Sequence, residues 1–141
     1  MKFPLVILLF SLVSCNSILN QDELSKSDLE RLKTLNLLDE DEKIIKFYSE
    51  YKNSVAGNFY TNKRLASYWL DENDESKNDT NCAFYEDIAK LDTVVYAGAT
   101  FSPYIKVICN DSSSFKVCFD GEKEEIRKTF LDIIAIWKKS L

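Results

Sequence analysis

The most constraining feature of this sequence is the apolar run near its start. After Met1 and Lys2, residues 3–13 are almost wholly apolar, and no acidic residue precedes position 15. The run is about a dozen residues long, whereas a transmembrane helix needs about 20. An export signal needs a basic start and an apolar stretch of about 7–15 residues. The length therefore predicts that the chain is exported and that the run does not span a membrane.

The end of this run, Leu12-Val13-Ser14-Cys15, resembles the lipobox of bacterial lipoproteins. In that class a diacylglyceryl group joins the cysteine sulfur, and a peptidase cleaves just before the cysteine. The resemblance implies a signal peptide over residues 1–14, lipidation of Cys15 and attachment of the mature chain to a membrane. Two or three acyl chains anchor a protein durably, whereas one chain binds marginally.

Residue 16 bears on which membrane carries the protein. It is Asn16 and not Asp, which by resemblance to enterobacterial sorting implies the outer membrane. We therefore expect a lipid-anchored protein of the bacterial cell envelope that faces the periplasm or the exterior.

Charge and composition narrow the function. The chain has 141 residues, a length that suits one domain. Without residues 1–14 it has 17 basic and 23 acidic residues, a formal charge of −6, which repels nucleic acids and anionic headgroups. His, the commonest general base and metal ligand, is absent from the sequence. We expect a non-enzymatic domain with no cofactor or metal, which binds neither nucleic acid nor a specific anionic headgroup.

Local patterns predict several elements of the mature chain. Residues 16–26 are polar enough for a tether, and Ser27 with Glu30 fits a capping box at the start of a helix over residues 27–37. Two strands meeting at a tight turn near Asn62 would explain the aromatic-rich residues 58–70. A polar loop over residues 71–81 follows. Further strands are expected at 82–85, 93–96, 104–109 and 115–119, the last two as a hairpin.

The last segment predicts an amphipathic helix whose start Asp120 can cap. Six apolar residues share one face of this helix: Ile126, Phe130, Ile133, Ile134, Trp137 and Leu141.

Residues 39–55 are ambiguous. Apolar residues fit one face of a helix, yet Ile45, Phe47 and Tyr51 also alternate with charged residues as in a strand. Periodicity alone slightly favours the helix.

The order of these pieces resembles bacterial pleckstrin-homology-like (GRAM-like) domains. The resemblance rests on the motifs at residues 41–45, 59–65 and 84–88, together with the hairpin and the last helix. It implies an α+β fold over residues 40–141: a bent, antiparallel, seven-stranded barrel closed by the C-terminal amphipathic helix. Residues 15–39 then supply a tether and a short N-terminal helix, and residues 43–51 become the first strand.

Eukaryotic members of that family often bind phosphoinositides through a basic loop between the first two strands. Here the loop near residues 52–57 has one base, Lys52, so the pattern departs from a headgroup site. Lys63 and Arg64 are adjacent bases, which we interpret as part of a turn and of an ion pair.

Three cysteines follow Cys15. Cys109 and Cys118 would point to opposite faces of their hairpin, which does not suit a disulfide between them. A disulfide between Cys82 and Cys118 stays open, because exported proteins meet oxidising conditions. We expect Cys109 to be a small buried apolar residue.

Two hypotheses about function follow. The first is a membrane-anchored, non-enzymatic binding domain whose partner is a protein, docked at a sheet edge or at the last helix. The alternative is a periplasmic immunity or inhibitor-like lipoprotein with a nuclear-transport-factor-like cone fold. A helix over residues 42–56 would favour the alternative.

Overall fold

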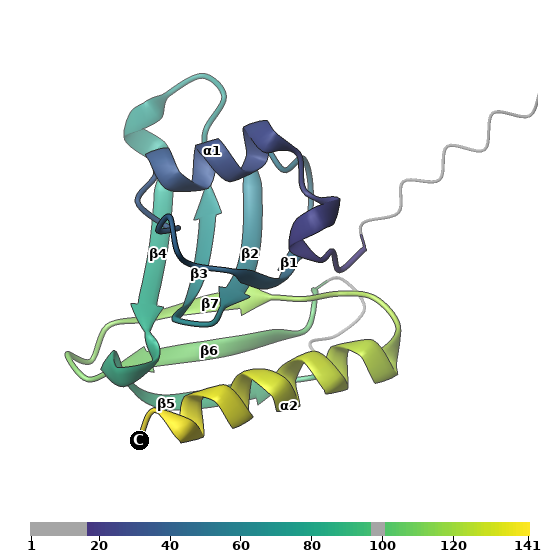
Figure 1. Cartoon of the computed structure of the whole chain (residues 1–141), viewed down its shortest axis with the longest axis vertical. Helices are drawn as coiled ribbons and strands as arrows, with labels where there is room; N and C mark the ends of the chain where they lie inside the picture. Colours follow the sequence, from purple (N-terminus) through teal and green to yellow (C-terminus); the bar gives the residue numbers. More distant parts are fainter. Residues whose placement is uncertain (1–16, 97–100) are drawn as a thin grey trace, which may run out of the picture.

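The computed structural model describes residues 17–96 and 101–141, so Cys15 and the expected signal peptide lie outside the described residues. Within these ranges the chain forms two antiparallel sheets (Figure 1). The first sheet has the order β1 (Ile44–Tyr48), β2 (Ala56–Thr61), β3 (Arg64–Trp69) and β4 (Asp79–Phe84). The second has the order β5 (Ile88–Val94), β6 (Tyr104–Cys109) and β7 (Ser114–Cys118). A short helix, η3 (Tyr85–Asp87), joins the two sheets.

Strand β1 resolves the ambiguous segment in favour of the family resemblance. The register between β1 and β2 shifts between Ile44 and Lys46, as at a β-bulge. Because of this shift, Ile44 and Phe47 pack into one core, whereas Tyr48 packs into the other. The bulge leaves two buried residues of one core three positions apart, which is also the spacing of residues on one face of a helix. The prediction of a helix from periodicity was wrong, and the cone-fold alternative that depended on it is not supported.

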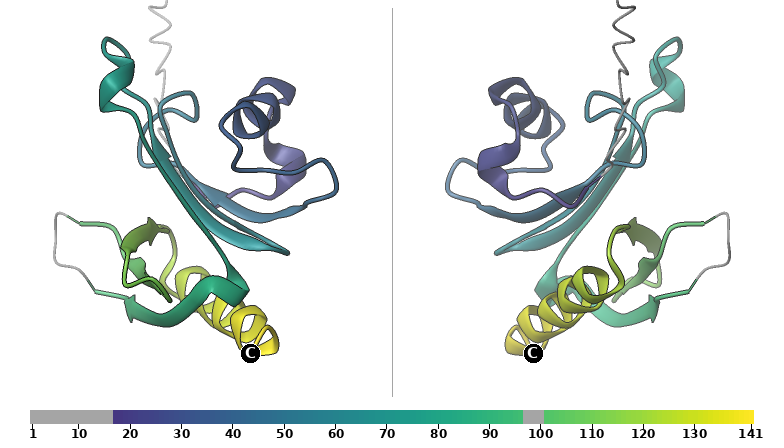
Figure 2. Two further views of the ribbon diagram at one scale, coloured as in Figure 1. Left: turned by 90° about the vertical axis from the view of Figure 1, so that its left-hand side faces the viewer. Right: turned by 90° about the vertical axis from the view of Figure 1, so that its right-hand side faces the viewer.

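The first sheet is covered on both faces. Helix α1 (Lys26–Thr34) lies over one face, and the second sheet with helix α2 (Lys123–Lys139) lies on the other (Figure 2). All six residues of β2 are buried as a result. Two apolar cores follow from this layering, one under α1 around Leu32, Phe47 and Phe59, and one between the sheets around Tyr60 and Phe119.

The N-terminal segment is packed and does not form the tether expected over residues 16–26. Ile18 is buried in the core between the sheets, and Leu24 in the core under α1. Leu19 pairs with Phe47 at the edge of β1: Leu19 N donates to the Phe47 carbonyl at 2.7 Å, and Phe47 N donates back at 2.9 Å. The folded body therefore begins at Ile18.

Helix α1 is capped two residues earlier than predicted. The Ser25 side chain accepts a hydrogen bond from Asp28 N at 3.0 Å, and Asp28 accepts one from Ser25 N at 3.2 Å. This capping box, and not one from Ser27 to Glu30, begins the helix. The helix ends at Thr34, and Asn36 follows with a φ of 58° that turns the chain away.

The β2–β3 turn lies where it was predicted, but for a different reason. Asn62 does not have the positive φ on which the prediction relied, because the described non-glycine residues with positive φ are Asn36 and Ser112. Instead the Thr61 hydroxyl oxygen accepts hydrogen bonds from the backbone N–H groups of Lys63 and Arg64, both at 2.9 Å. The expected loop over 71–81 is shorter, because η2 (Glu75–Lys77) interrupts it and β4 begins at Asp79.

Helix α2 packs on the sheets through Ile126, Phe130 and Ile133, as predicted. Glu122 precedes it without a side-chain cap, and Asp120 accepts a hydrogen bond from Gly121 N, so the expected cap by Asp120 was wrong. Leu141 lies past the helix and is 81% exposed. The seven described strands form two separate sheets of four and three strands, and with the packed C-terminal helix they make an α+β fold.

Candidate functional site

A cluster of charged side chains joins the start of β1 to the β2–β3 turn. Arg64 of β3 is buried, with a side chain that is 3% exposed, and it makes two parallel hydrogen bonds to the carboxylate of Glu42. The distances are 2.9 Å from Nε to Oε1 and 2.7 Å from Nη2 to Oε2. Asp39 lies 3.1 Å from Nη2, and the Asn36 carbonyl accepts from Nη1 at 3.2 Å.

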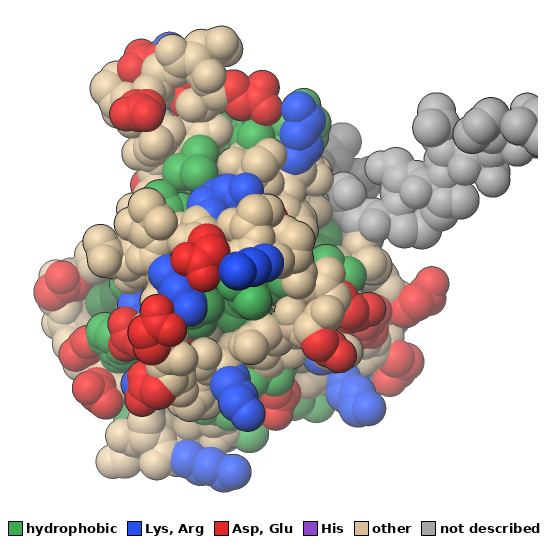
Figure 3. All heavy atoms as spheres, turned by 45° about the horizontal axis from the view of Figure 1, so that its top comes forward, with side chains coloured by type: hydrophobic (Ala, Val, Ile, Leu, Met, Phe, Trp, Pro, Cys, Tyr) green, Lys and Arg blue, Asp and Glu red, His purple; other side chains and the backbone are tan. Residues whose placement is uncertain are grey.

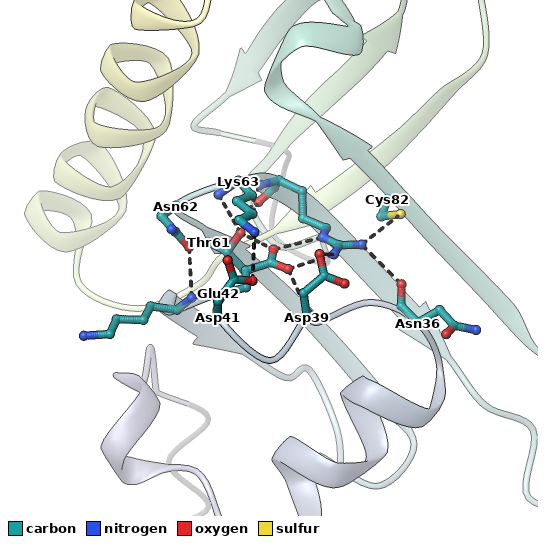
Figure 4. A network of polar contacts seen from close by, with 10 residues as sticks. Asn36, Asp39, Asp41, Glu42, Thr61, Asn62, Lys63 and Cys82 are labelled. Carbon is teal, nitrogen blue, oxygen red and sulfur yellow. Dashed lines mark hydrogen bonds and ion pairs between the residues drawn. The ribbon is translucent and has the colours of Figure 1, made fainter.

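The Glu42 carboxylate is held by three groups (Figure 4). Besides Arg64, the Thr61 hydroxyl donates to Oε1 at 2.5 Å, and Asp39 N donates to Oε2 at 2.9 Å. Burial alone would raise the pKa of Glu42, but the hydrogen bonds from Arg64 and Thr61 hold that pKa below its ordinary value. The carboxylate therefore stays ionised inside the fold.

This cluster is a structural clamp and leaves little for a ligand to bind. Arg64 already contacts carboxylates, a carbonyl and the Phe84 ring, whose centroid lies 4.5 Å from its guanidinium carbon. Lys63 pairs with Asp41 at 2.9 Å at the surface. Both residues make ion pairs, as predicted, but Arg64 is buried in β3, a strand interior to the sheet.

Lys52, the single basic residue of the loop between β1 and β2, contacts other side chains of this chain. Lys52 lies 3.3 Å from Glu72 and 5.0 Å from the centre of the Tyr51 ring. Tyr51 in turn stacks on Trp69 with ring centres 6.5 Å apart. On the face shown in Figure 3, basic side chains are interleaved with acidic and apolar ones. Neither feature resembles a basic headgroup pocket.

A groove with a volume of about 900 Å³ lies between β1 and α2. Its apolar lining comes from Ile45, Tyr60 and Leu131, and charged residues surround them. The charged lining residues are Lys46, Glu124, Glu125, Lys128 and Asp132.

One hydrogen bond joins the two elements that line this groove. The Tyr60 hydroxyl donates to Asp132 at 2.7 Å and so ties β2 to α2. Burial, and then this contact, raises the pKa of Tyr60 well above its ordinary value, so the phenol stays protonated. Leu131 is 57% exposed and points away from the buried stripe of its helix.

Sequence analysis did not identify these groove residues. Leu131 could have indicated this surface from the sequence alone, because it is a large apolar residue outside the apolar face of an amphipathic helix. The Tyr60–Asp132 contact had no such signal, because it joins residues 72 positions apart in the chain.

A second groove of about 470 Å³ lies beside the connection from β5 to β6. Glu50, Phe101 and Cys118 are among its lining residues. Burial raises the pKa of the Cys118 thiol to about 11, so this thiol is not a ready nucleophile. The Asn58 side chain fixes the strand here by accepting a hydrogen bond from Cys118 N at 2.9 Å and donating one to Glu50 at 2.6 Å.

The described cysteines Cys82, Cys109 and Cys118 are free thiols in the structure. Cys82 lies opposite Ala66, which belongs to the core under α1, whereas Cys118 lies in β7 on the other side of the first sheet. The pairing of Cys82 with Cys118 is therefore not formed here. Cys109 is partly buried against the core between the sheets.

Two kinds of feature are absent from the part of the chain that the structure describes. Among residues 17–96 and 101–141, no three His, Cys, Asp or Glu side chains are grouped to hold a metal ion. Within the same ranges, no helix has both the length and the apolar character needed to cross a membrane.

No protein-family model matches the sequence, and no curated protein matches it. Solved structures resemble the fold, among them two from Shewanella species. The first is a DUF1696 family protein with a pleckstrin-homology domain from Shewanella loihica PV-4, with a TM-score of 0.54 and 17% identity over 82% of this chain and 94% of that chain. The second is a pleckstrin-homology domain from Shewanella amazonensis SB2B, with a TM-score of 0.47 and 18% identity over 76% of this chain and 88% of that chain. The first likeness shows that the chain has a pleckstrin-homology-like fold.

Proposed function

We propose that this chain is a lipid-anchored, non-enzymatic binding module of the bacterial cell envelope, with lipid on Cys15 and a protein as its partner. The anchor rests on the lipobox-like residues Leu12 to Cys15. The binding role is supported by the pleckstrin-homology-like fold, a typically non-enzymatic fold that displays surfaces for partners. The sorting rule for Asn16 favours the outer membrane.

The observation that carries the binding role is the groove between β1 and α2. It combines an apolar floor with a rim of both charge signs, which is the make-up of a protein–protein contact. A nucleic acid or an anionic surface would need a rim of one positive sign. The exposed Leu131 lies on this groove and offers an apolar contact for the partner.

A photo-crosslinking amino acid tests the binding role when it replaces Leu131 in living cells. We expect position 131 to give a discrete adduct, because its side chain lies on the groove. Position 141 is the matched control, since Leu141 follows the same helix and is 81% exposed. The change Lys128→Glu should reduce the adduct by reversing the charge of an exposed residue on the rim. Equal labelling at both positions, or no adduct at position 131, would contradict the proposal.

Mass spectrometry of the mature protein tests the anchor. We expect membrane-bound protein to begin at Cys15 and to carry a diacylglyceryl group and an additional acyl chain. The change Cys15→Ala should prevent lipidation and cleavage, whereas Cys82→Ala should change neither. Mature protein that retains residues 1–14 or has an unmodified Cys15 would refute the anchor.

A further inference from the structure

The attachment point proposed above lies very close to the folded body. Only Asn16 and Ser17 separate Cys15 from Ile18, which is 7% exposed and packed in the core. A fully extended chain covers about 3.3–3.6 Å per residue, so Cys15 lies within about 10 Å of Ile18. A lipid on Cys15 therefore cannot hold the domain at a distance; the side of the domain near Ile18 must lie against the membrane.

The neighbours of Ile18 identify that side. Ile18 shares a core cluster with Tyr48 and Phe119, and it lies beside Gly121. Asp120, the residue before Gly121, lies 3.5 Å from the Ser102 hydroxyl, and Val94 and Phe101 line one groove with Ser102. Within 17–96 and 101–141, the membrane side therefore includes the residues that flank the β5–β6 connection.

Those flanking residues are unusually apolar for a surface. Tyr96 is 85% exposed, Phe101 is 73% exposed and Val95 is 43% exposed. Phe101 also lines a groove with Glu50 and Val94. We name Val95, Tyr96 and Phe101 the apolar rim.

We infer that the apolar rim contacts the lipid surface that carries Cys15, at the boundary between headgroups and acyl chains. A tyrosine such as Tyr96 favours this boundary because its ring can be buried while its hydroxyl stays hydrated, and Val95 and Phe101 add apolar surface. The short tether makes the contact intramolecular, so a weak attraction is sufficient to populate it. Glu50, Asp120 and Lys116 lie nearby, so the surroundings carry both charge signs and the contact that we infer is apolar.

This inference rests on the lipid anchor, and the experiment separates the two. The probe is the full lipidated protein in vesicles of phosphatidylethanolamine and phosphatidylglycerol that also contain phosphatidylcholine brominated near the top of its chains. Bromine quenches indole emission at short range. The background is Trp69→Phe, so that Trp137, in the last turns of α2, is the remaining native indole.

Two matched substitutions are compared in this background. Tyr96→Trp introduces an indole at the apolar rim, and Leu141→Trp introduces one at the C-terminus, at sites that are 85% and 81% exposed. We expect brominated lipid to remove most of the emission added by Tyr96→Trp and little of that added by Leu141→Trp. Mass spectrometry of the same samples first establishes the lipid on Cys15. If lipidated protein shows equal quenching at the two sites, the inference fails and the anchor stands; if Cys15 has no lipid, both fail.

Discussion

Replacing Arg64 with alanine is expected to lower the free energy of unfolding by about 3–5 kcal/mol, the usual cost of removing one partner from a buried ion pair. The change leaves the Glu42 carboxylate, whose side chain is 0% exposed, without its principal counter-charge. It also removes the guanidinium from the Phe84 ring and from the Asn36 carbonyl. Urea denaturation of a form that begins at Asn16 would measure the loss.

The matched control for Arg64→Ala is its neighbour Lys63→Ala. Lys63 makes a single ion pair with Asp41, and the two side chains are 35% and 78% exposed. Exposed pairs contribute about 0–1 kcal/mol, so this variant should remain close to the wild type. Equal losses in the two variants would show that Arg64 does not act as the buried clamp.

The dependence of the free energy of unfolding on pH provides a second test of the ion pair between Arg64 and Glu42. The folded-state pKa of Glu42 lies below its ordinary value of 4.5, whereas the unfolded chain has the ordinary value. Its contribution to stability is therefore complete above about pH 4.5 and is lost as the pH falls through the folded-state pKa. Glu42→Gln should flatten the dependence of the free energy of unfolding on pH in this acidic window. A slope identical to that of the wild type would contradict the clamp.

The sequence predicted best those elements whose signal is local. The β6–β7 hairpin follows from alternation around a turn of small polar residues, and α2 follows from apolar spacing on one face. Strand β1 was recovered only through the family resemblance, because its bulge gives a spacing like that of a helix. Strand β4 begins earlier than expected, since Asp79 and Thr80 are exposed polar residues with no apolar alternation.

Contacts between distant segments could not be predicted. Ile18, Leu19 and Leu24 are isolated apolar residues in a polar stretch. No local pattern predicts that Ile18 and Leu24 are buried in the two cores or that Leu19 pairs with the edge of the first sheet. Likewise Lys63 and Arg64 look alike in sequence. Only the fold places Arg64 inside the sheet opposite Glu42, 22 residues earlier in the chain. The apolar rim and the β1–α2 groove depend on the same long-range packing.

Phe119 is the residue through which the two sheets and α2 are held together. Its ring is 0% exposed and makes edge contacts with Tyr60 of the first sheet and Phe130 of α2, at centroid distances of 6.0 and 6.4 Å. Edge-to-face aromatic pairs add stability beyond the area they bury. Removing this ring would leave a cavity where three elements meet.

The change Phe119→Ala is therefore expected to lower the free energy of unfolding by about 3–5 kcal/mol, the range for large-to-alanine changes in a core. Phe101→Ala is the matched control: the same side chain is removed at a position that is 73% exposed, where surface changes stay within about 0.5 kcal/mol. Urea denaturation would measure both. Because α2 loses its aromatic contact with the sheets, amide exchange should also rise around Phe130 in the first variant alone. A loss below about 1 kcal/mol for Phe119→Ala would contradict its central place in the core.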